Sequence, residues 1–381
     1  MTGPTVLVRP ADNGGCGHYR LRQPASHLNG QGVTVTETWP SATFEDGPLG
    51  TRIRHVDCTA DVLVLQRVME PEVVQAIPVL QRQGTAVVVE IDDDFEHLPH
   101  GHPARRGTTA TLDTTPTGPA PRGVLPRGIG VRPTHDLQVV TPKAQRRWLR
   151  EACMAADLVT VSTPALAAVY APHGRVAVLP NLVPDHYLDL PLPVHDGPVR
   201  VGWTGSTHTH VGDLDVTDGA VAQAVEDSGA ALWVVGTGDG VAAGLGMEPD
   251  HCTGWMELDD YPAAYAELDV AIVPLAPNPF NEAKSWLKGL EAGALGVPFV
   301  ASPTGPYRQL HDLGAGLLAA TPAEWRRHVT RLACIDEARL EHAERGRDVA
   351  ARLTYGEHAW RWLEAWHEAI RHHRHRRSSA A

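Results

Sequence analysis

Two lysines and a glutamate lie between residues 284 and 291 at helical spacing. Lys284, Lys288 and Glu291 take positions i, i+4 and i+7 of a helix predicted over Glu282–Ala294, so their charged ends should share one face. Two ammonium groups near a helix N-terminus add to the positive end of the helix dipole. The spacing therefore predicts a diphosphate site with a carboxylate beside it that accepts hydrogen bonds from sugar hydroxyls. A salt-bridged surface helix is the structural alternative.

A glycine-rich turn follows the predicted strand Thr5–Val8. It contains Gly14 and Gly15, and it reaches His18 just before a predicted helix. In α/β folds such a strand-to-helix turn is where backbone can touch donor phosphates or an acceptor. A histidine beside three glycines is hard to bury in a core, so His18 is a candidate functional residue.

Three consecutive acids, Asp92, Asp93 and Asp94, follow a predicted strand over Thr85–Ile91. Adjacent carboxylates repel one another, so the cluster calls for a physical reason. Contact with acceptor hydroxyls, helix capping and a divalent cation are the alternatives. We favour the acceptor contact and predict no metal site.

Strands and helices alternate along the chain, which predicts parallel sheets with crossover helices. In the first half the predicted strands are Thr5–Val8, Val33–Thr36, Asp61–Leu65, Thr85–Ile91, Leu158–Val161 and Arg175–Leu179, with helices at Glu70–Gln83, Pro142–Ala156 and Thr163–Tyr170. In the second half they are Val199–Trp203, Ala231–Val235, His251–Thr253, Val270–Val273 and Phe299–Ser302, with helices at Asp218–Asp227, Pro262–Leu268 and Glu282–Ala294. We expect two doubly wound domains with ligands beyond the carboxyl ends of the strands.

Three segments interrupt this alternation. Residues 100–136 lack apolar periodicity and are too long for an ordinary connection, which indicates a lid or a disordered segment. The proline-rich Val183–Pro198 is the candidate linker. After a final amphipathic helix, the tail Arg371–Arg377 reads as a solvated, frayed terminus, with metal or phosphate binding as the alternative.

Composition narrows the function classes. The 381 residues carry a net charge of −12, which disfavours a general polyanion binder, and no stretch reaches the ~20 apolar residues of a membrane span. The N-terminus lacks the pattern of a signal peptide, so we expect a cytoplasmic protein. The five cysteines form no CxxC pair, which argues against a zinc ribbon or a disulfide framework.

Several motifs together resemble a known family. The string from Lys288 to Ser302, KGLEAGALGVPFVAS, looks like the donor-binding signature of the retaining family-four glycosyltransferases of GT-B fold, and Phe280-Asn281 with Lys284-Ser285 looks like their bacterial and phage-borne branch. Further matches in the same order are Ala156–Thr163, Pro180-Asn181, Val201–Ser206, Gly254-Trp255 and Leu268–Val270.

The resemblance implies two Rossmann-like domains facing a central cleft. It places an acceptor-side domain over residues 1–186, a nucleotide-sugar-binding domain over 197–355, and a C-terminal helix with its tail over 356–381. That helix is expected to cross back to the N-terminal domain. No cofactor or metal is required by such enzymes.

The resemblance also implies roles for single residues. Glu291 would bind the ribose hydroxyls, Gly254 and Trp255 would line the base, and the turn from Gly205 through Ser206 and Thr207 to His208 would approach the diphosphate. In inverting GT-B enzymes a histidine on the loop after the first strand deprotonates the acceptor hydroxyl, so His18 would be that base. Two departures from the family stand out. Ala283 occupies the position of the first of two family glutamates, so Glu282 is the nearest candidate, and the usual Arg…Lys pair after Gly205 is replaced by Thr207, His208 and His210.

The sequence thus favours a glycosyltransferase that uses a nucleotide-sugar, with a UDP-sugar favoured and GDP- or dTDP-sugars as alternatives. The acceptor would be a small molecule, a glycan or a peptide rather than nucleic acid, and retention of configuration is favoured. An epimerase that acts on UDP-sugars and a non-catalytic nucleotide-sugar-binding partner are the rival functions.

Overall fold

The computed structural model describes residues 3–380 except 39, 48–49, 106–140 and 192–194. The chain divides into two compact units. Unit 1 combines residues 1–96, 104–180 and 359–381, and unit 2 combines residues 97–103 and 181–358. The predicted end of the N-terminal domain at residue 186 therefore lies a few residues after the observed boundary between Pro180 and Asn181.

Unit 1 is built on a parallel sheet in the order β2-β1-β5-β6-β7-β8. Its strands are β1 (Thr5–Arg9), β2 (Thr34–Glu37), β5 (Val62–Gln66), β6 (Ala86–Ile91), β7 (Leu158–Val161) and β8 (Val176–Val178). Every residue of β5 and β6 is buried, as expected for strands covered on both faces. The strand order reverses between β1 and β5, so the carboxyl ends of these strands are where a doubly wound sheet accommodates ligands.

Helices surround this sheet. They are α1 (Gly15–Gly17), α2 (Gln23–Leu28), α3 (Pro71–Gln83), α4 (Pro142–Ala155), α5 (Pro164–Tyr170) and α15 (Trp360–Ala380), with the π-helical turn η1 (His18–Arg22) and the 3₁₀ turn η3 (Ala171–His173). An antiparallel hairpin of β3 (Ala42–Gly47) and β4 (Gly50–Val56) was not predicted. The 3₁₀ turn η2 (Pro103–Arg105) immediately precedes residue 106, so most of the predicted lid over 100–136 lies outside the described residues.

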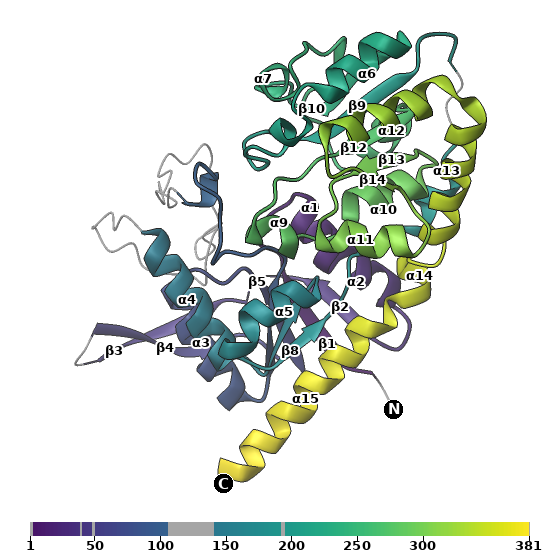
Figure 1. The fold of residues 1–381 in the computed structure, drawn as a ribbon. Coiled ribbons are helices and arrows are strands. Elements are labelled where there is room, and N and C mark those ends of the chain that lie inside the picture. The colour runs from purple at the N-terminus through teal and green to yellow at the C-terminus, as the bar shows by residue number, and fades with distance from the viewer. Residues whose placement is uncertain (1–2, 39, 48–49, 106–140, 192–194, 381) are drawn as a thin grey trace, which may run out of the picture. The chain divides into compact units, whose positions relative to one another are not determined.

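The C-terminal helix α15 returns to unit 1, as predicted. In Figure 1 it is the long yellow helix, and it packs against β5, β6 and β7. The indole of Trp362 is buried and donates a hydrogen bond to the carbonyl of Arg20 over 3.1 Å. Arg20 in turn forms a fully buried ion pair with Glu90, with Nε 2.7 Å from Oε1.

The prediction of a frayed tail is wrong. The helix continues to Ala380, and His373 is 4% exposed. Arg376 lies 3.0 Å from the buried carboxylate of Asp157, and His372 Nδ1 lies 3.0 Å from the Asp157 carbonyl. A buried carboxylate beneath the helix gives the basic tail a partner that the local sequence does not show.

Unit 2 repeats the architecture, with a parallel sheet in the order β11-β10-β9-β12-β13-β14. Its strands are β9 (Arg200–Gly205), β10 (Ala231–Gly236), β11 (His251–Cys252), β12 (Val270–Val273), β13 (Phe299–Ala301) and β14 (Leu317–Leu318). Alternate residues of β12 face opposite sides, with Ile272 on the face of one apolar cluster and Val273 on the other. Two apolar faces require helices on both sides of the sheet.

The helices of unit 2 supply those two layers. They are α6 (Ala220–Ser228), α7 (Val241–Leu245), α8 (Tyr261–Ala266), α9 (Pro279–Ala283), α10 (Leu287–Ala294), α11 (Gly305–Asp312), α12 (Pro322–Cys334), α13 (Asp336–Ala350) and α14 (Tyr355–His358), with 3₁₀ turns η4 (Asp185–Asp189) and η5 (Leu214–Thr217). Helices α6 and α12 contribute to one cluster, and α8, α10 and α11 contribute to the other. The predicted fold class of two doubly wound Rossmann-like domains is confirmed.

The predicted linker over Val183–Pro198 is wrong in its first half. Val183 pairs with Thr354 as an isolated bridge, and the Tyr187 ring in η4 is buried in the unit 2 core. Arg347 donates a hydrogen bond to the Leu188 carbonyl over 2.6 Å. Proline-rich composition marked a segment without regular structure, but its aromatic and aliphatic side chains fix it to unit 2.

Candidate functional site

The carboxyl ends of β9 and β10 approach each other closely through two glycines. Gly205 and Gly236 have φ of +134° and +135°, a backbone conformation that other residues rarely adopt. A Cβ on Gly236 would lie 2.3 Å from the Gly205 carbonyl oxygen, and a Cβ on Gly205 would lie 2.7 Å from Lys288 Nζ. Glycine at position 205 therefore leaves the space that the lysine ammonium occupies.

Lys288 lies in the first turn of α10 and points at this edge. Its Nζ donates hydrogen bonds to the Thr204 carbonyl over 2.6 Å and to His210 Nε2 over 2.9 Å, and it stands 5.2 Å from the centre of the Trp203 ring. Burial and the nearby Lys284 ammonium lower the pKa of Lys288 to about 7. The positive end of α10 further disfavours an uncompensated cation, so the arrangement favours an anion at this place.

The single helix predicted over Glu282–Ala294 is wrong. Asn278 caps the short helix α9, and Lys284 ends it with φ −59° and ψ 160° before α10 begins at Leu287. The Trp286 indole donates to the Asn181 carbonyl over 2.8 Å, which fixes the break. Lys284 and Lys288 therefore come from two helices rather than from one helical face.

The two lysines are nevertheless electrostatic neighbours. The charge of Lys284 lowers the pKa of Lys288 and of His210, after the larger effect of burial on each. The Lys284 ammonium lies 4.7 Å from the centre of the Phe280 ring. The predicted pair of positive charges is therefore present, although the geometry that unites it differs from the prediction.

Glu291 lies one turn after Lys288 on α10 and is 2% exposed. The Tyr261 hydroxyl is 3.4 Å from Glu291 Oε2 and 3.3 Å from the Thr204 hydroxyl. A buried carboxylate close to a lysine and a tyrosine can accept hydrogen bonds from ligand hydroxyls.

Glu282 has a structural partner that the sequence did not reveal. Its Oε2 accepts the backbone N–H of Gly305 over 2.8 Å at the start of α11, and it lies 3.7 Å from Arg308. A carboxylate at a helix N-terminus stabilises that helix. Glu282 therefore stabilises the start of α11, and its predicted catalytic contact stays a prediction.

The remaining predicted donor contacts lie on loops of unit 2. The Thr207 hydroxyl donates to the Asp239 carbonyl over 2.5 Å, and the Ser206 carbonyl accepts the N–H of Thr209 over 3.2 Å. Gly254 has φ +77°, and the Trp255 side chain after it is 80% exposed. An exposed indole beyond β11 offers an apolar face to a planar ring.

Two residues of this edge were missed or undervalued. The sequence marks His210 only as a departure from the family pattern and predicts no role for Asp213. Asp213 is 1% exposed, and its Oδ1 accepts hydrogen bonds from the Ala276 N–H over 2.9 Å and from Asn281 Nδ2 over 2.7 Å. A His-x-x-Asp pair directly after a glycine-ended strand was the available signal.

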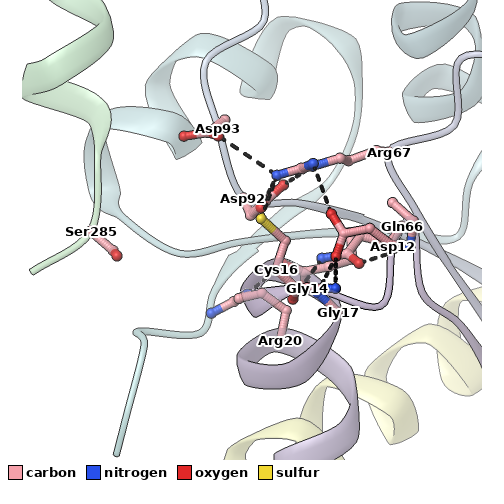
Figure 2. A network of polar contacts seen from close by, with 12 residues as sticks. Asp12, Gly14, Cys16, Gly17, Arg20, Gln66, Arg67, Asp92, Asp93 and Ser285 are labelled. Carbon is pink, nitrogen blue, oxygen red and sulfur yellow. Dashed lines mark hydrogen bonds and ion pairs between the residues drawn. The ribbon is translucent and has the colours of Figure 1, made fainter. Parts of the chain in front are cut away.

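Unit 1 contains a second network at the carboxyl ends of β1, β5 and β6, which Figure 2 shows from close by. Asp12 Oδ1 accepts the N–H groups of Gly14 and Gly17 over 3.0 and 3.2 Å. Gln66 accepts the N–H of Ala11 and donates to the carbonyl of Cys16, over 3.0 and 3.1 Å. The glycine-rich turn is therefore held in one conformation by its own aspartate and by the end of β5.

Arg67 lies at the centre of this second network. Its guanidinium bonds both oxygens of Asp92, from Nε to Oδ1 over 2.6 Å and from Nη2 to Oδ2 over 2.5 Å. It also lies 3.3 Å from Asp12, 2.6 Å from Cys16 Sγ and 3.7 Å from Asp93. Burial raises the pKa of the Cys16 thiol, which therefore meets Arg67 as a neutral sulfur.

These contacts weigh against two predictions. The Gly14 N–H is already bonded, and the carboxylates of Asp12, Asp92 and Asp93 would repel a phosphate here, so the donor-phosphate role of Gly14 and Gly15 is not supported. Asp92 pairs with Arg67, and Asp94, 1% exposed, caps the Glu96 N–H over 3.0 Å. Asp93 is the most exposed of the three acids, with 30% of its side chain accessible.

His18 lies in η1 beside this network. Its Nε2 is 3.0 Å from Gln23 Nε2, and its ring meets the Tyr19 ring edge-on at 4.9 Å.

Among the residues that the structure describes, no three histidine, cysteine or acidic side chains are arranged to hold a metal ion. None of the described helices is both long and apolar enough to cross a bilayer.

Comparisons with known proteins agree with this architecture. Residues 198–334, inside unit 2, match the family model described as glycosyl transferases group 1. Sucrose-phosphate synthase from Thermosynechococcus elongatus has a similar structure, with TM-score 0.55 and 14% identity over 97% of this chain and 99% of that one. HepE from Anabaena, solved with UDP, gives 0.57 and 14% over 95% and 98%.

TarM of S. aureus, solved with UDP, α-GlcNAc-glycerol and fondaparinux, gives TM-score 0.51 and 14% identity over 81% of this chain, which spans only 55% of TarM. No curated protein sequence matches the chain. The structural likenesses establish that the chain has the GT-B fold, and residues 198–334 of its C-terminal unit are similar to the group 1 glycosyl transferase model.

Proposed function

We propose that this protein is a glycosyltransferase that moves a sugar from a nucleoside diphosphate sugar to an acceptor hydroxyl. The observation that carries the proposal is the cluster of Lys284, Lys288 and Glu291 at the carboxyl edge of a sheet inside a group 1 glycosyl transferase domain. UDP is the favoured nucleotide, because similar GT-B structures were solved with UDP or UDP-glucose. The acceptor class is a small molecule, a glycan or a peptide.

The donor would bind along the edge of unit 2. Lys288 and Lys284 would neutralise the diphosphate, and the backbone of the Gly205–Thr207 turn would approach it. Glu291 would accept hydrogen bonds from the ribose hydroxyls, and Trp255 would cover the base. Each contact uses a group whose position in unit 2 is described above.

The chemistry then depends on the leaving group. As the bond between the sugar carbon and the phosphate oxygen breaks, negative charge develops on the diphosphate, and two preorganised ammonium groups stabilise it. In the retaining reaction that we favour, the departing phosphate oxygen takes the proton of the acceptor hydroxyl. An inverting reaction would instead need His18 as the base.

The acceptor would contact unit 1. Acidic side chains around the glycine-rich turn favour a hydroxyl-rich acceptor over a phosphorylated one, because carboxylates accept hydrogen bonds from hydroxyls and repel phosphates. Asp93 is the acid of this cluster with the greatest exposure, so it is the strongest candidate for that contact.

Donor binding can be tested directly. Thermal unfolding with UDP-, GDP- and dTDP-sugars should show stabilisation by one nucleotide class, about 2.7 kcal/mol at a ligand concentration of 100 Kd. Release of free nucleoside diphosphate on addition of an acceptor then separates a transferase from an epimerase or a non-catalytic binder. A protein stabilised by no nucleotide-sugar would contradict the proposal.

Alanine substitution of the two lysines tests their role in catalysis. Lys288→Ala and Lys284→Ala should each lower turnover by ~10² or more, because each removes a few kcal/mol of charge stabilisation. Lys143→Ala, at an exposed position of α4, serves as the control and should retain turnover. Wild-type turnover in both active-site variants would overturn the assigned role.

A further inference from the structure

A chain of three polar side chains ends at the Lys288 ammonium. Asp213 Oδ2 lies 2.8 Å from His210 Nδ1, and His210 Nε2 lies 2.9 Å from Lys288 Nζ. Asp213 is itself held by the Ala276 N–H and by Asn281. A buried carboxylate with two further donors is a rigid anchor for the imidazole.

The hydrogen bonds that join Asp213, His210 and Lys288 permit one placement of the protons. The ionised Asp213 carboxylate accepts from Nδ1–H, so Nε2 of the neutral ring carries the lone pair and accepts from Lys288. Burial, followed by the charges of Lys288 and Lys284, lowers the pKa of His210 to about 3, so the ring stays neutral. His210 therefore aims a lone pair, not a charge, at the ammonium.

Lysine is rare in this protein. The sequence contains 33 lysine and arginine residues, of which only Lys143, Lys284 and Lys288 are lysines. Arginine keeps its proton in proteins, whereas a partly buried lysine can lose it. Two of the three lysines therefore stand where a cation with a removable proton meets the proposed donor.

We propose that His210, oriented by Asp213, is the positioning residue for Lys288, and that Lys288 takes up a proton from solvent when a nucleoside diphosphate binds. The inference rests on the proposed function and adds two residues to its donor site. The binding step is then a proton-linked association, in which the diphosphate, the ammonium and the imidazole form one hydrogen-bonded unit.

The charges around Lys288 are consistent with this linkage. Lys284 faces it from the segment before α10, His210 and Asp213 from the loop after β9, and Glu291 from α10 itself. Burial and Lys284 lower its pKa, Asp213 and Glu291 raise it, and the result is about 7. A bound diphosphate adds negative charge and favours the protonated form, so the pKa of Lys288 rises on binding.

Isothermal titration of the whole protein with UDP at pH 8, in two buffers of different ionisation enthalpy, measures the proton uptake. Free UDP is fully ionised there, because the second phosphate pKa is near 6. A group whose pKa lies below the buffer pH in the free protein and that becomes protonated on binding takes up most of one proton per UDP. Affinity for UDP should fall about tenfold per pH unit between pH 7.5 and 9.

Three variants test whether Lys288 is the group that takes up the proton. Lys288→Arg is always charged, so its uptake should vanish and its affinity should stay level over the same range. His210→Gln and Asp213→Asn should weaken UDP binding by ~10-fold, the latter because an amide beside Nδ1 favours the other tautomer and turns an N–H toward Lys288. His186→Gln, at an exposed position of η4 in the same unit and outside the proposed donor site, is the matched control.

A spectroscopic arm separates this inference from the proposed function. With ¹³C-labelled lysine only three side chains give signals, and Lys288→Arg assigns one of them. The Lys288 signal should titrate near pH 7 in the free protein and shift its midpoint in His210→Gln, for which thermal melting confirms folding.

A midpoint above pH 9.5, or one that His210→Gln leaves unchanged, would overturn the positioning role even if UDP binds. Failure of every nucleotide to bind, with the titration as expected, would instead contradict the proposed function.

Discussion

Arg67 supplies the positive charge that the clustered carboxylates of unit 1 need. Its φ of +51° is unusual for a side chain larger than glycine, and the surrounding contacts maintain that conformation. Asp92, Asp12 and Asp93 all face its guanidinium. The repulsion that made the acidic run conspicuous in the sequence is therefore relieved by an arginine 25 residues away, and no metal ion is needed for that purpose.

Arg67→Gln should destabilise the protein by about 3–5 kcal/mol at pH 7, because it leaves the carboxylate of Asp92 buried without its partner. Urea unfolding measures the change. Arg52→Gln, which removes an exposed ion pair with Glu45 in the β3–β4 hairpin, is the control and should cost less than 1 kcal/mol. Equal effects of the two substitutions would show that the Arg67 network is not a stabilising one.

The same pair predicts a pH dependence. Burial alone would raise the pKa of Asp92, but Arg67 outweighs it and the pKa is lowered. A lowered carboxyl pKa contributes stability that is present above the unfolded value near 3.9 and is lost as pH falls below it. Without Arg67 the buried acid protonates more readily, so the stability difference between wild type and Arg67→Gln should narrow from pH 7 to pH 4. A difference that is constant with pH would contradict this linkage.

At the scale of elements, the strands were predictable and the helix break was not. The run of residues 86–89 is apolar on both faces, which is typical of a covered parallel strand. Residues 284–286 contain nothing that ends a helix, and the break depends on the bond from the Trp286 indole to Asn181, more than 100 residues away in the chain. Periodicity records local preference, whereas such tertiary bonds leave no local pattern.

The residues of the candidate site likewise fall into those that the sequence could predict and those that it could not. Lys284, Lys288 and Glu291 could be proposed because they stand inside a family-like motif, although the single helix that their spacing predicted is broken between Ala283 and Leu287. The role of Arg67 could not be predicted, because its carboxylate partners are brought close by the sheet, and a lone arginine after a strand is ordinary. Asp213 left a signal in its spacing from His210, but its bonds to Ala276 and Asn281, 63 and 68 residues away, leave no local pattern. The capping bond of Glu282 could not be predicted either, because its partner, the Gly305 N–H, is a backbone group that sequence patterns do not reveal.

Helix α10 also depends on a close contact with α13. A Cβ on Gly293 would lie 2.8 Å from the Gly346 carbonyl oxygen, a backbone atom that cannot move aside alone. In an open helix, glycine to alanine stabilises by about 1 kcal/mol. Here we expect Gly293→Ala to destabilise by about 1–3 kcal/mol, because overpacking outweighs propensity.

Thermal unfolding measures the sign of that change. Glu344→Ala, on the exposed side of α13, should stay within about 0.5 kcal/mol of wild type and is the control. Since α10 holds Lys288, Gly293→Ala should also weaken nucleotide binding. A stabilised variant with intact binding would show that the two helices are free to separate.

At the scale of the whole molecule, each unit takes residues from distant parts of the chain. Unit 1 is completed by α15, whose Trp362 and Trp366 are each 1% exposed. The net charge of −12 is likewise an average, because the tail that packs on unit 1 is strongly basic. The C-terminal segment is therefore part of the unit 1 core rather than an appendage, and its removal should act on that unit.

The contact between the tail and Asp157 gives the decisive test at this scale. Deleting residues 373–381 removes Arg376 and His373 from a carboxylate that is fully buried, and it should lower the free energy of unfolding by about 1.5–3 kcal/mol. Deleting only 378–381 keeps both contacts and should change little. Asp157→Asn, which removes the charge, should destabilise the full chain but cost less in the chain that lacks 373–381. Additive effects in this cycle, measured by urea unfolding, would show that the tail stabilises unit 1 by apolar packing alone.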